Sequence, residues 1–276
     1  ELPLSVPLAP VIVGSNSSFG SGGTVVLNGS ILQSNGSRTV SNPLSLAVAT
    51  TISGSSDLAL TGTLIQTGTN LTLTTSNTGN TTLGDVALSN AANRTLTIAG
   101  AGNLTIGGNI SDGGTATASA LIMSGNGTLT LSGANTYGGT TTVNSGTLAL
   151  GNSNVTKDSS AITVAGGTLA IGDFSDTVGA VTLSSGSITG ANGTLSGSSY
   201  SITNAAGNST ISAKLGGAGT LTKTGAGNLT MSGNNSYTGT TTLTAGTVIV
   251  DSNSSFGSGG TVVLNGSTLQ SNGSRT

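Results

Sequence analysis

The 276-residue sequence predicts an all-β protein that folds as a parallel β-solenoid. The first observation is the alternation of apolar residues with Thr or Ala at 129–131, 148–150 and 162–164, which is typical of half-buried strands. The second is composition, since Gly, Thr, Ser and Asn together make up more than half of the chain. The third is repetition along the chain. A sandwich of this size usually buries more than the six aromatic residues present (3 Tyr, 3 Phe), so thin stacked coils are favoured.

The strands are predicted to be short and the turns frequent. Six Asn-Gly steps occur, and each can adopt the positive φ that a tight turn requires. No apolar pattern of helical period spans any window, and the abundant Gly disfavours helix. With roughly 20–25 residues per coil, we expect roughly 11–12 coils in all.

One long repeat organises the chain. Residues 11–39 and 248–276 differ at two positions only, Gly14/Asp251 and Ile31/Thr268. We therefore divide the chain into a leader (1–10) and a single solenoid (11–276), the latter made of one full period (11–247) and the start of the next (248–276). Such similarity indicates a recent duplication and a tandem array.

A shorter repeat lies inside this period. Residues 125–150 align with residues 225–250, with 14 identities in 26 positions. Their shared pattern, G-x-G-x-L-T-x-S-G-x-N-x-Y-x-G-x-T-x-V/L-x-x-G-T-L/V, resembles the autotransporter-associated β-strand repeat of large bacterial surface proteins. The resemblance implies a right-handed β-helix passenger at the bacterial cell surface or outside the cell. It also implies a structural role for the motif residues: Tyr137, Tyr237, Gly139, Gly239, Gly146 and Gly246.

Composition excludes several functions. The chain has no His and no Cys, which removes the usual transition-metal ligands and the common nucleophile–base arrangements. Six basic residues do not make a phosphate-binding groove, so nucleic acid is not expected as a partner. No apolar run reaches the roughly 18 residues that a spanning helix needs, and no transmembrane helix is predicted. We expect neither an enzyme nor a cofactor or metal.

Two groups of polar residues are candidate sites. Asp173 and Asp176 are the closest acidic pair, suited to glycoside hydrolysis or to Ca²⁺, but we interpret them as a solvated loop. Thr140–Thr142 and Thr240–Thr242 suggest an ice-binding face. Such a face needs the same Thr pattern in successive coils, whereas these two copies lie far apart in the sequence, so ordinary β propensity is the favoured interpretation.

The leader has its own pattern. Leu2, Leu4, Val6 and Leu8 alternate with Pro3, Ser5, Pro7 and Ala9. As a strand it would pair on one edge only, because proline lacks the N–H donor. It is predicted to cap the solenoid or to join a neighbouring subunit through these four apolar residues; a plain linker is the alternative.

The leading hypothesis for function is a structural, non-catalytic solenoid. It would build fibres or a surface coat by tandem repetition or by head-to-tail stacking of the chain on itself, because the ends of a solenoid are unpaired β edges. The alternative is an adhesin that binds surface glycans through an aromatic face: Tyr137, Tyr237 and Phe174.

Overall fold

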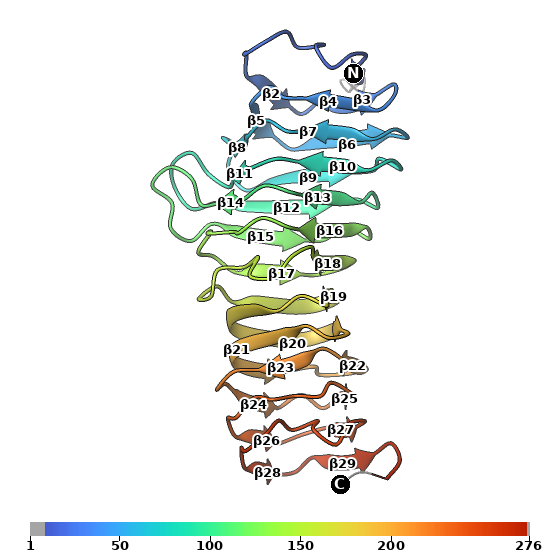
Figure 1. Cartoon of the computed structure of the whole chain (residues 1–276), viewed down its shortest axis with the longest axis vertical. Helices are drawn as coiled ribbons and strands as arrows, with labels where there is room; N and C mark the ends of the chain where they lie inside the picture. The colour runs from blue at the N-terminus through green and yellow to red at the C-terminus, as the bar shows by residue number, and fades with distance from the viewer. Residues whose placement is uncertain (1–8, 275–276) are drawn as a thin grey trace, which may run out of the picture.

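In the computed structural model, which describes residues 9–274, the chain winds into a column of about 13 stacked coils. Figure 1 shows the column running from the N-terminal coil at one end to the C-terminal coil at the other. Every strand pairing among the described residues is parallel, as β10 with β13 and β26 with β28 show. The predicted all-β parallel solenoid is therefore confirmed. Its right-handed winding stays a prediction.

The coils are more numerous than the predicted 11–12, because many of them are short. The coil that leads from Val164 to its paired neighbour Leu183 is clearly shorter than the one that leads from Ile98 to Met123. Most coils of the C-terminal half are of the shorter kind, so more of them fit into the chain.

Each coil has up to three strands, which stack into three faces. The first face holds, in order, β1 (Val11–Val13), β3 (Ile31–Ser34), β6 (Thr50–Gly54), β9 (Leu71–Thr75), β12 (Thr95–Ala99), β15 (Ala120–Met123), β17 (Thr141–Val143), parts of β19 (Ile162–Gly172), β20 (Asp176–Gly190) and β21 (Thr194–Ile202), then β24 (Thr220–Lys223), β26 (Thr241–Leu243) and β28 (Val262–Leu264).

The second face continues each coil after the first. It holds β4 (Arg38–Val40), β7 (Leu58–Leu60), β10 (Thr81–Leu83), β13 (Leu104–Ile106), β16 (Thr128–Leu131), β18 (Thr147–Leu150), the later parts of β19 and β20, then β22 (Asn208–Ile211), β25 (Asn228–Met231), β27 (Thr247–Val250) and β29 (Thr268–Ser271).

The third face is the least regular. It begins as a five-stranded sheet of β2 (Val25–Asn28), β5 (Leu44–Val48), β8 (Leu64–Gln66), β11 (Val86–Ala87) and β14 (Ile110–Ser111). Further along, only the starts of β20 and β21 and the strand β23 (Lys214–Gly216) continue it. Loops close this face in the coils between.

The core is a set of aliphatic ladders along the axis. On the second face one ladder runs through paired residues that are all fully buried: Leu129, Leu148, Leu169, Ile188, Ile211 and Met231. Because side chains alternate between the two sides of a strand, the strand residues directly before and after each ladder residue point outward. Burial of apolar area in this thin interior stabilises the column.

The predicted leader residues Leu2, Leu4, Val6 and Leu8 lie outside the described residues. From β1 to β29 the pairings continue without a break. Among the described residues, no helix has the length and apolar character to span a membrane.

Candidate functional site

The repeat tyrosines lie inside the solenoid. Tyr137 and Tyr237 are 2% and 0% exposed, and both lie in the loop that closes the third face. The hydroxyl of Tyr137 shares a hydrogen bond with Thr141 Oγ1 at 2.5 Å, and that of Tyr237 with Thr241 Oγ1 at 2.6 Å. The predicted exposed aromatic face is therefore wrong for both residues, because both side chains are buried as part of the core.

Burial also changes the acidity of these phenols. Removal from water raises the pKa of Tyr137 and of Tyr237 to about 12, and the hydrogen bonds to threonine only partly offset this. Burial raises the pKa of Tyr200 as well; its ring centre lies 5.9 Å from that of Tyr237. The tyrosines are neutral packing groups and hydrogen-bond partners.

Two asparagines that precede the tyrosines were missed from the sequence. Asn135 Oδ1 accepts the backbone N–H of Ile110 at 2.7 Å, and Asn235 Oδ1 accepts that of Leu215 at 2.8 Å. At these coils the third face has no strand to accept those donors, so a side-chain amide replaces the backbone ladder. The signal was present in the sequence, since both stand two residues before the repeat tyrosine.

The repeat glycines allow the coils to approach. A Cβ added at Gly139 would lie 2.3 Å from the carbonyl oxygen of Ser119, and one at Gly239 would lie 2.4 Å from that of Gly219. Gly146 and Gly246 combine such an approach with φ of +64° and +73°, a region that side chains with a Cβ rarely adopt. Each conspicuous motif position thus has a contact with the preceding coil or its own turn to explain it.

Two stretches of the chain match a known family, the Passenger-associated-transport-repeat, at residues 121–150 and 221–250. The chain carries passenger-type β-helix repeats. Each of these passenger repeats begins on the first face and runs through the motif tyrosine to the second-face strand of the next coil. The resemblance to autotransporter passengers is thereby confirmed. No curated protein and no solved structure matches the chain.

The two residues of the predicted acidic pair lie in different surroundings, because Asp173 precedes β20 and Asp176 is its first residue. Asp173 is exposed and accepts a hydrogen bond from Asn192 Nδ2 at 2.7 Å. Asp176 is buried, accepts the N–H of Thr156 at 3.0 Å, and its Oδ1 has no hydrogen-bond partner. Burial raises the pKa of Asp176. The solvated-loop interpretation is right for Asp173 and wrong for Asp176. Phe174 is half-buried against the core.

Thr rows run along the solenoid after all. On the first face the register aligns outward-facing residues of six successive coils: Thr142, Thr163, Thr182, Ser201, Thr222 and Thr242. The Thr-x-Thr pattern of 140–142 is nevertheless not repeated in the next two coils, where the aligned residues 161–163 and 180–182 each begin with Ala. The second face carries a row of the same kind, through Thr128, Thr147, Thr168, Ser187, Thr210 and Thr230. Since both faces share it, the row expresses β propensity and distinguishes neither face as a site.

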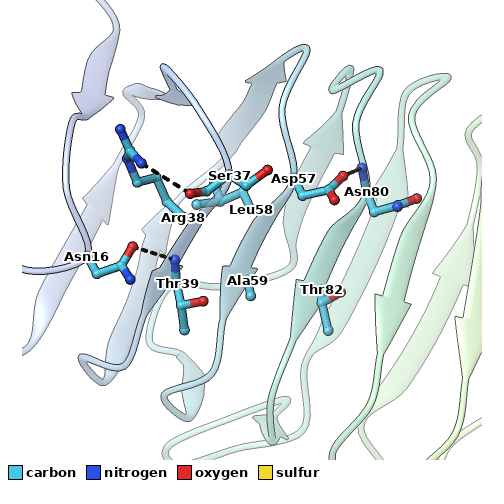
Figure 2. A pocket seen from close by; sticks show the side chains of 9 residues that line it. All are labelled: Asn16, Ser37, Arg38, Thr39, Asp57, Leu58, Ala59, Asn80 and Thr82. Carbon is cyan, nitrogen blue, oxygen red and sulfur yellow. Dashed lines mark hydrogen bonds between the residues drawn. The ribbon is translucent and has the colours of Figure 1, made fainter.

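A polar hollow of about 370 Å³ lies over the second face near the N-terminal end. Figure 2 shows Thr39, Ala59 and Thr82 side by side on its floor, from β4, β7 and β10. At its rim Asn16 Oδ1 accepts the N–H of Thr39 at 3.0 Å, and Asp57 Oδ1 accepts that of Asn80 at 2.8 Å. These two contacts bind one coil to the next, whereas Arg38 Nη1 donates to the carbonyl oxygen of Ser37 in its own coil.

Hydrogen bonds of the same kind, from a backbone N–H of one coil to a side-chain oxygen of the coil before it, recur further along the column. Carboxyl or amide oxygens of Asn70, Asp85 and Asn103 accept backbone N–H groups of the following coil. No aromatic side chain lines the hollow of Figure 2, so it offers no stacking platform for a sugar ring. Among the described residues no cluster of three acidic, His or Cys side chains has the geometry to hold a metal ion.

The long repeat presents one sequence in two environments. We call residues 11–34 (β1 to β3) the first repeat coil and residues 248–271 (β27 to β29) the last repeat coil. Leu27 and Leu32 are 4% and 2% exposed, whereas their equivalents Leu264 and Leu269 are 55% and 40% exposed. In the first repeat coil these leucines are covered by the coil that follows, which pairs through Leu46 and through Ile52.

On the opposite side of the repeat coil, the exposed copy is the first one and the buried copy is the last one. Val11 of the first repeat coil is 40% exposed, whereas its equivalent Val248 is fully buried on β25. The first repeat coil is therefore covered on its C-terminal side, by β5 and β6. The last repeat coil is covered on its N-terminal side, by β25 and β26. The repeat coil is thus seen with either side buried against a neighbouring coil, which makes its two sides the candidate contact surfaces.

Proposed function

We propose that this protein is a structural, non-catalytic solenoid of the bacterial surface or its surroundings, which builds fibres or a coat by continued coil stacking. The passenger repeats and the β-solenoid fit an autotransporter passenger-like surface protein. The family also indicates the cell surface or the extracellular space. What the proposal adds is the mechanical role and the continuation of the column.

The repeat coil carries this proposal. Leu264 and Leu269 are open at one end, and the same residues are buried as Leu27 and Leu32 when a coil follows. Apolar area removed from water contributes about 25 cal/mol per Å², so a further coil on this edge is favoured. Whether the next coil belongs to the same chain or to a second molecule, the contact is head-to-tail and does not close on itself.

The composition supports a building material. Charged residues are only 5% of the chain, and neighbouring coils place equivalent positions directly opposite one another, where like charges would repel. Main-chain hydrogen bonds run parallel to the axis in every face, so a pull along the column loads many of them together.

Imaging of the purified chain tests the proposal. Negative-stain electron microscopy, with sedimentation as a second readout, should show unbranched filaments one solenoid wide, lengthening with protein concentration. A population of single short rods at all concentrations would contradict stacking between molecules. The glycan-binding alternative is weakened, because two of its three aromatic residues are buried.

A further inference from the structure

We propose that two molecules of this chain join by exchanging the repeat coil. The last repeat coil (248–271) of one molecule takes the place of the first repeat coil (11–34) on β5 and β6 of the next. The partner is thus a second copy of this chain, bound through an interface that already exists within it. This inference rests on the proposed function, since it specifies how the column continues from one molecule to another.

The acceptor is defined by the contacts that hold the first repeat coil. β2 pairs with β5 through Val25 with Leu44 and Leu27 with Leu46. β3 pairs with β6 through Leu32 and Ile52. The Asn42 side chain adds a hydrogen bond to the carbonyl oxygen of Gly23 at 2.9 Å. All of these contacts are made by residues that the last repeat coil also contains, at positions 260, 262, 264 and 269.

The two substitutions between the coils do not obstruct the exchange. Ile31 pairs with Thr51 at an outward, half-exposed position, where the Thr268 side chain fits as well. Gly14 is exposed, and a Cβ there would meet its nearest neighbour, Asn35 Nδ2, at 3.8 Å. That is ordinary van der Waals contact, so Asp251 fits in the same turn.

The alternative to exchange is to stack the two intact ends. That would place the first repeat coil directly on the last repeat coil, a pair of neighbours that occurs nowhere in the described chain. Exchange instead repeats the pairing of β2 with β5 and of β3 with β6. It breaks one coil interface and forms the same interface again, as domain swapping does.

The first repeat coil is also the easier one to displace. On its side away from β5 and β6, Val11 is 40% exposed, whereas the equivalent Val248 is fully buried. Among the described residues one coil interface holds it, whereas the last repeat coil in an exchanged joint is held on both sides, by β25 and β26 below and by β5 and β6 above. The first repeat coil therefore acts as an internal cover over the joining surface, and joining requires its release.

Cysteine pairs test this directly, because the chain has no cysteine of its own. Val26 and Ser45 are paired neighbours on the outer surface, within the Cα separation that a disulfide requires. The double variant V26C/S45C locks the first repeat coil onto β5 when oxidised. We expect the oxidised molecule to lose filament formation and the reduced molecule to regain it. Equal assembly in both states would overturn the exchange.

A second arm reads the joint itself. Val263 is the equivalent of Val26, so exchange places it beside Ser45 of the next molecule. A mixture of V263C molecules with S45C molecules should form a disulfide-linked pair on oxidation, and V263C mixed with wild type should not. Absence of the mixed link would overturn the exchange. This arm does not depend on long filaments, so it separates failure of the exchange from failure of the proposed function.

Discussion

The phenol groups of Tyr137 and Tyr237 sit where the third face turns into the first, and each hydroxyl faces a threonine four residues further on. The two sites repeat the same contact in the two copies of the shorter repeat. Thr141 and Thr241 are themselves almost fully buried. At the scale of single residues, each passenger repeat is thus closed by a buried pair of polar groups that satisfy one another.

Removing one member of this pair should be costly. In Tyr237→Phe the Thr241 hydroxyl stays buried without its partner, which costs about 1–3 kcal/mol in the free energy of unfolding. The double variant Tyr237→Phe/Thr241→Val removes both polar groups and should recover part of the loss. Urea unfolding measures both. A Tyr237→Phe protein as stable as the wild type would show that the hydrogen bond contributes nothing.

The raised tyrosine pKa values predict a stability change in alkali. Folded Tyr137 and Tyr237 ionise near pH 12, whereas an unfolded tyrosine ionises near its ordinary value of 10.0. Their stabilising contribution is complete below pH 10 and is lost as the pH rises towards 12, by up to about 1.4 kcal/mol per pH unit for each tyrosine. The variant Tyr137→Phe/Tyr237→Phe should show a flatter decline. Tyrosinate absorbance at pH 10 in the folded protein, equal to that of free tyrosine, would refute this.

Glycines decide how closely the strands and turns of neighbouring coils approach. At Gly239 the backbone of the preceding coil fills the space that a Cβ would need, whereas at Gly23 nothing lies within 4 Å. Neither position has a positive φ. The two residues therefore form a pair for comparison, in which only Gly239 has no room for a Cβ.

This pair gives a prediction at the level of the coil. Gly239→Ala forces two coils apart and should lower the free energy of unfolding by about 1–3 kcal/mol. Gly23→Ala should change it by no more than about 0.5 kcal/mol. Thermal unfolding of the two variants beside the wild type decides it. Equal melting temperatures would mean that the close approach at Gly239 is not required.

At the scale of the elements, the strands could be predicted from the sequence but their register could not. Strands were predictable because the alternation at 129–131 or 148–150 is local. Register was not, because the coils differ in length, so the Thr row through Thr142 and Thr163 stayed hidden. The burial of Tyr137 and Asp176 depends on packing between coils, which is a tertiary feature. The repeat motif marked Tyr137 as structural without revealing its burial.

At the scale of the whole molecule, the long repeat provides its own control. Leu269 is exposed at the end of the column, and Leu32 is buried in the same sequence near the start. Leu269→Lys should abolish assembly with little effect on stability. Leu32→Lys buries an unpaired charge and should cost several kcal/mol, on the order of 3–5. Light scattering and urea unfolding separate the two effects. Normal assembly of Leu269→Lys would contradict the proposed end contact.

The repeat also determines the geometry of any filament. From β1 to β26 the first face advances by eleven coils, and β27, the equivalent of β1, lies one face further round. Each joined molecule that shares the repeat coil therefore adds eleven coils and one face. Adjacent coils lie about 4.8 Å apart, so the rise per molecule is about 54 Å.

Cryo-electron microscopy of the filaments measures this rise. Exchange of the repeat coil predicts about 54 Å per molecule, with a rotation of about one third of a turn added to the twist of the column. Stacking of intact ends adds about 13 coils per molecule and predicts about 62 Å. The smaller rise, with parallel strands continuous across every joint, supports coil exchange. The larger rise, or rods that never join, contradicts it.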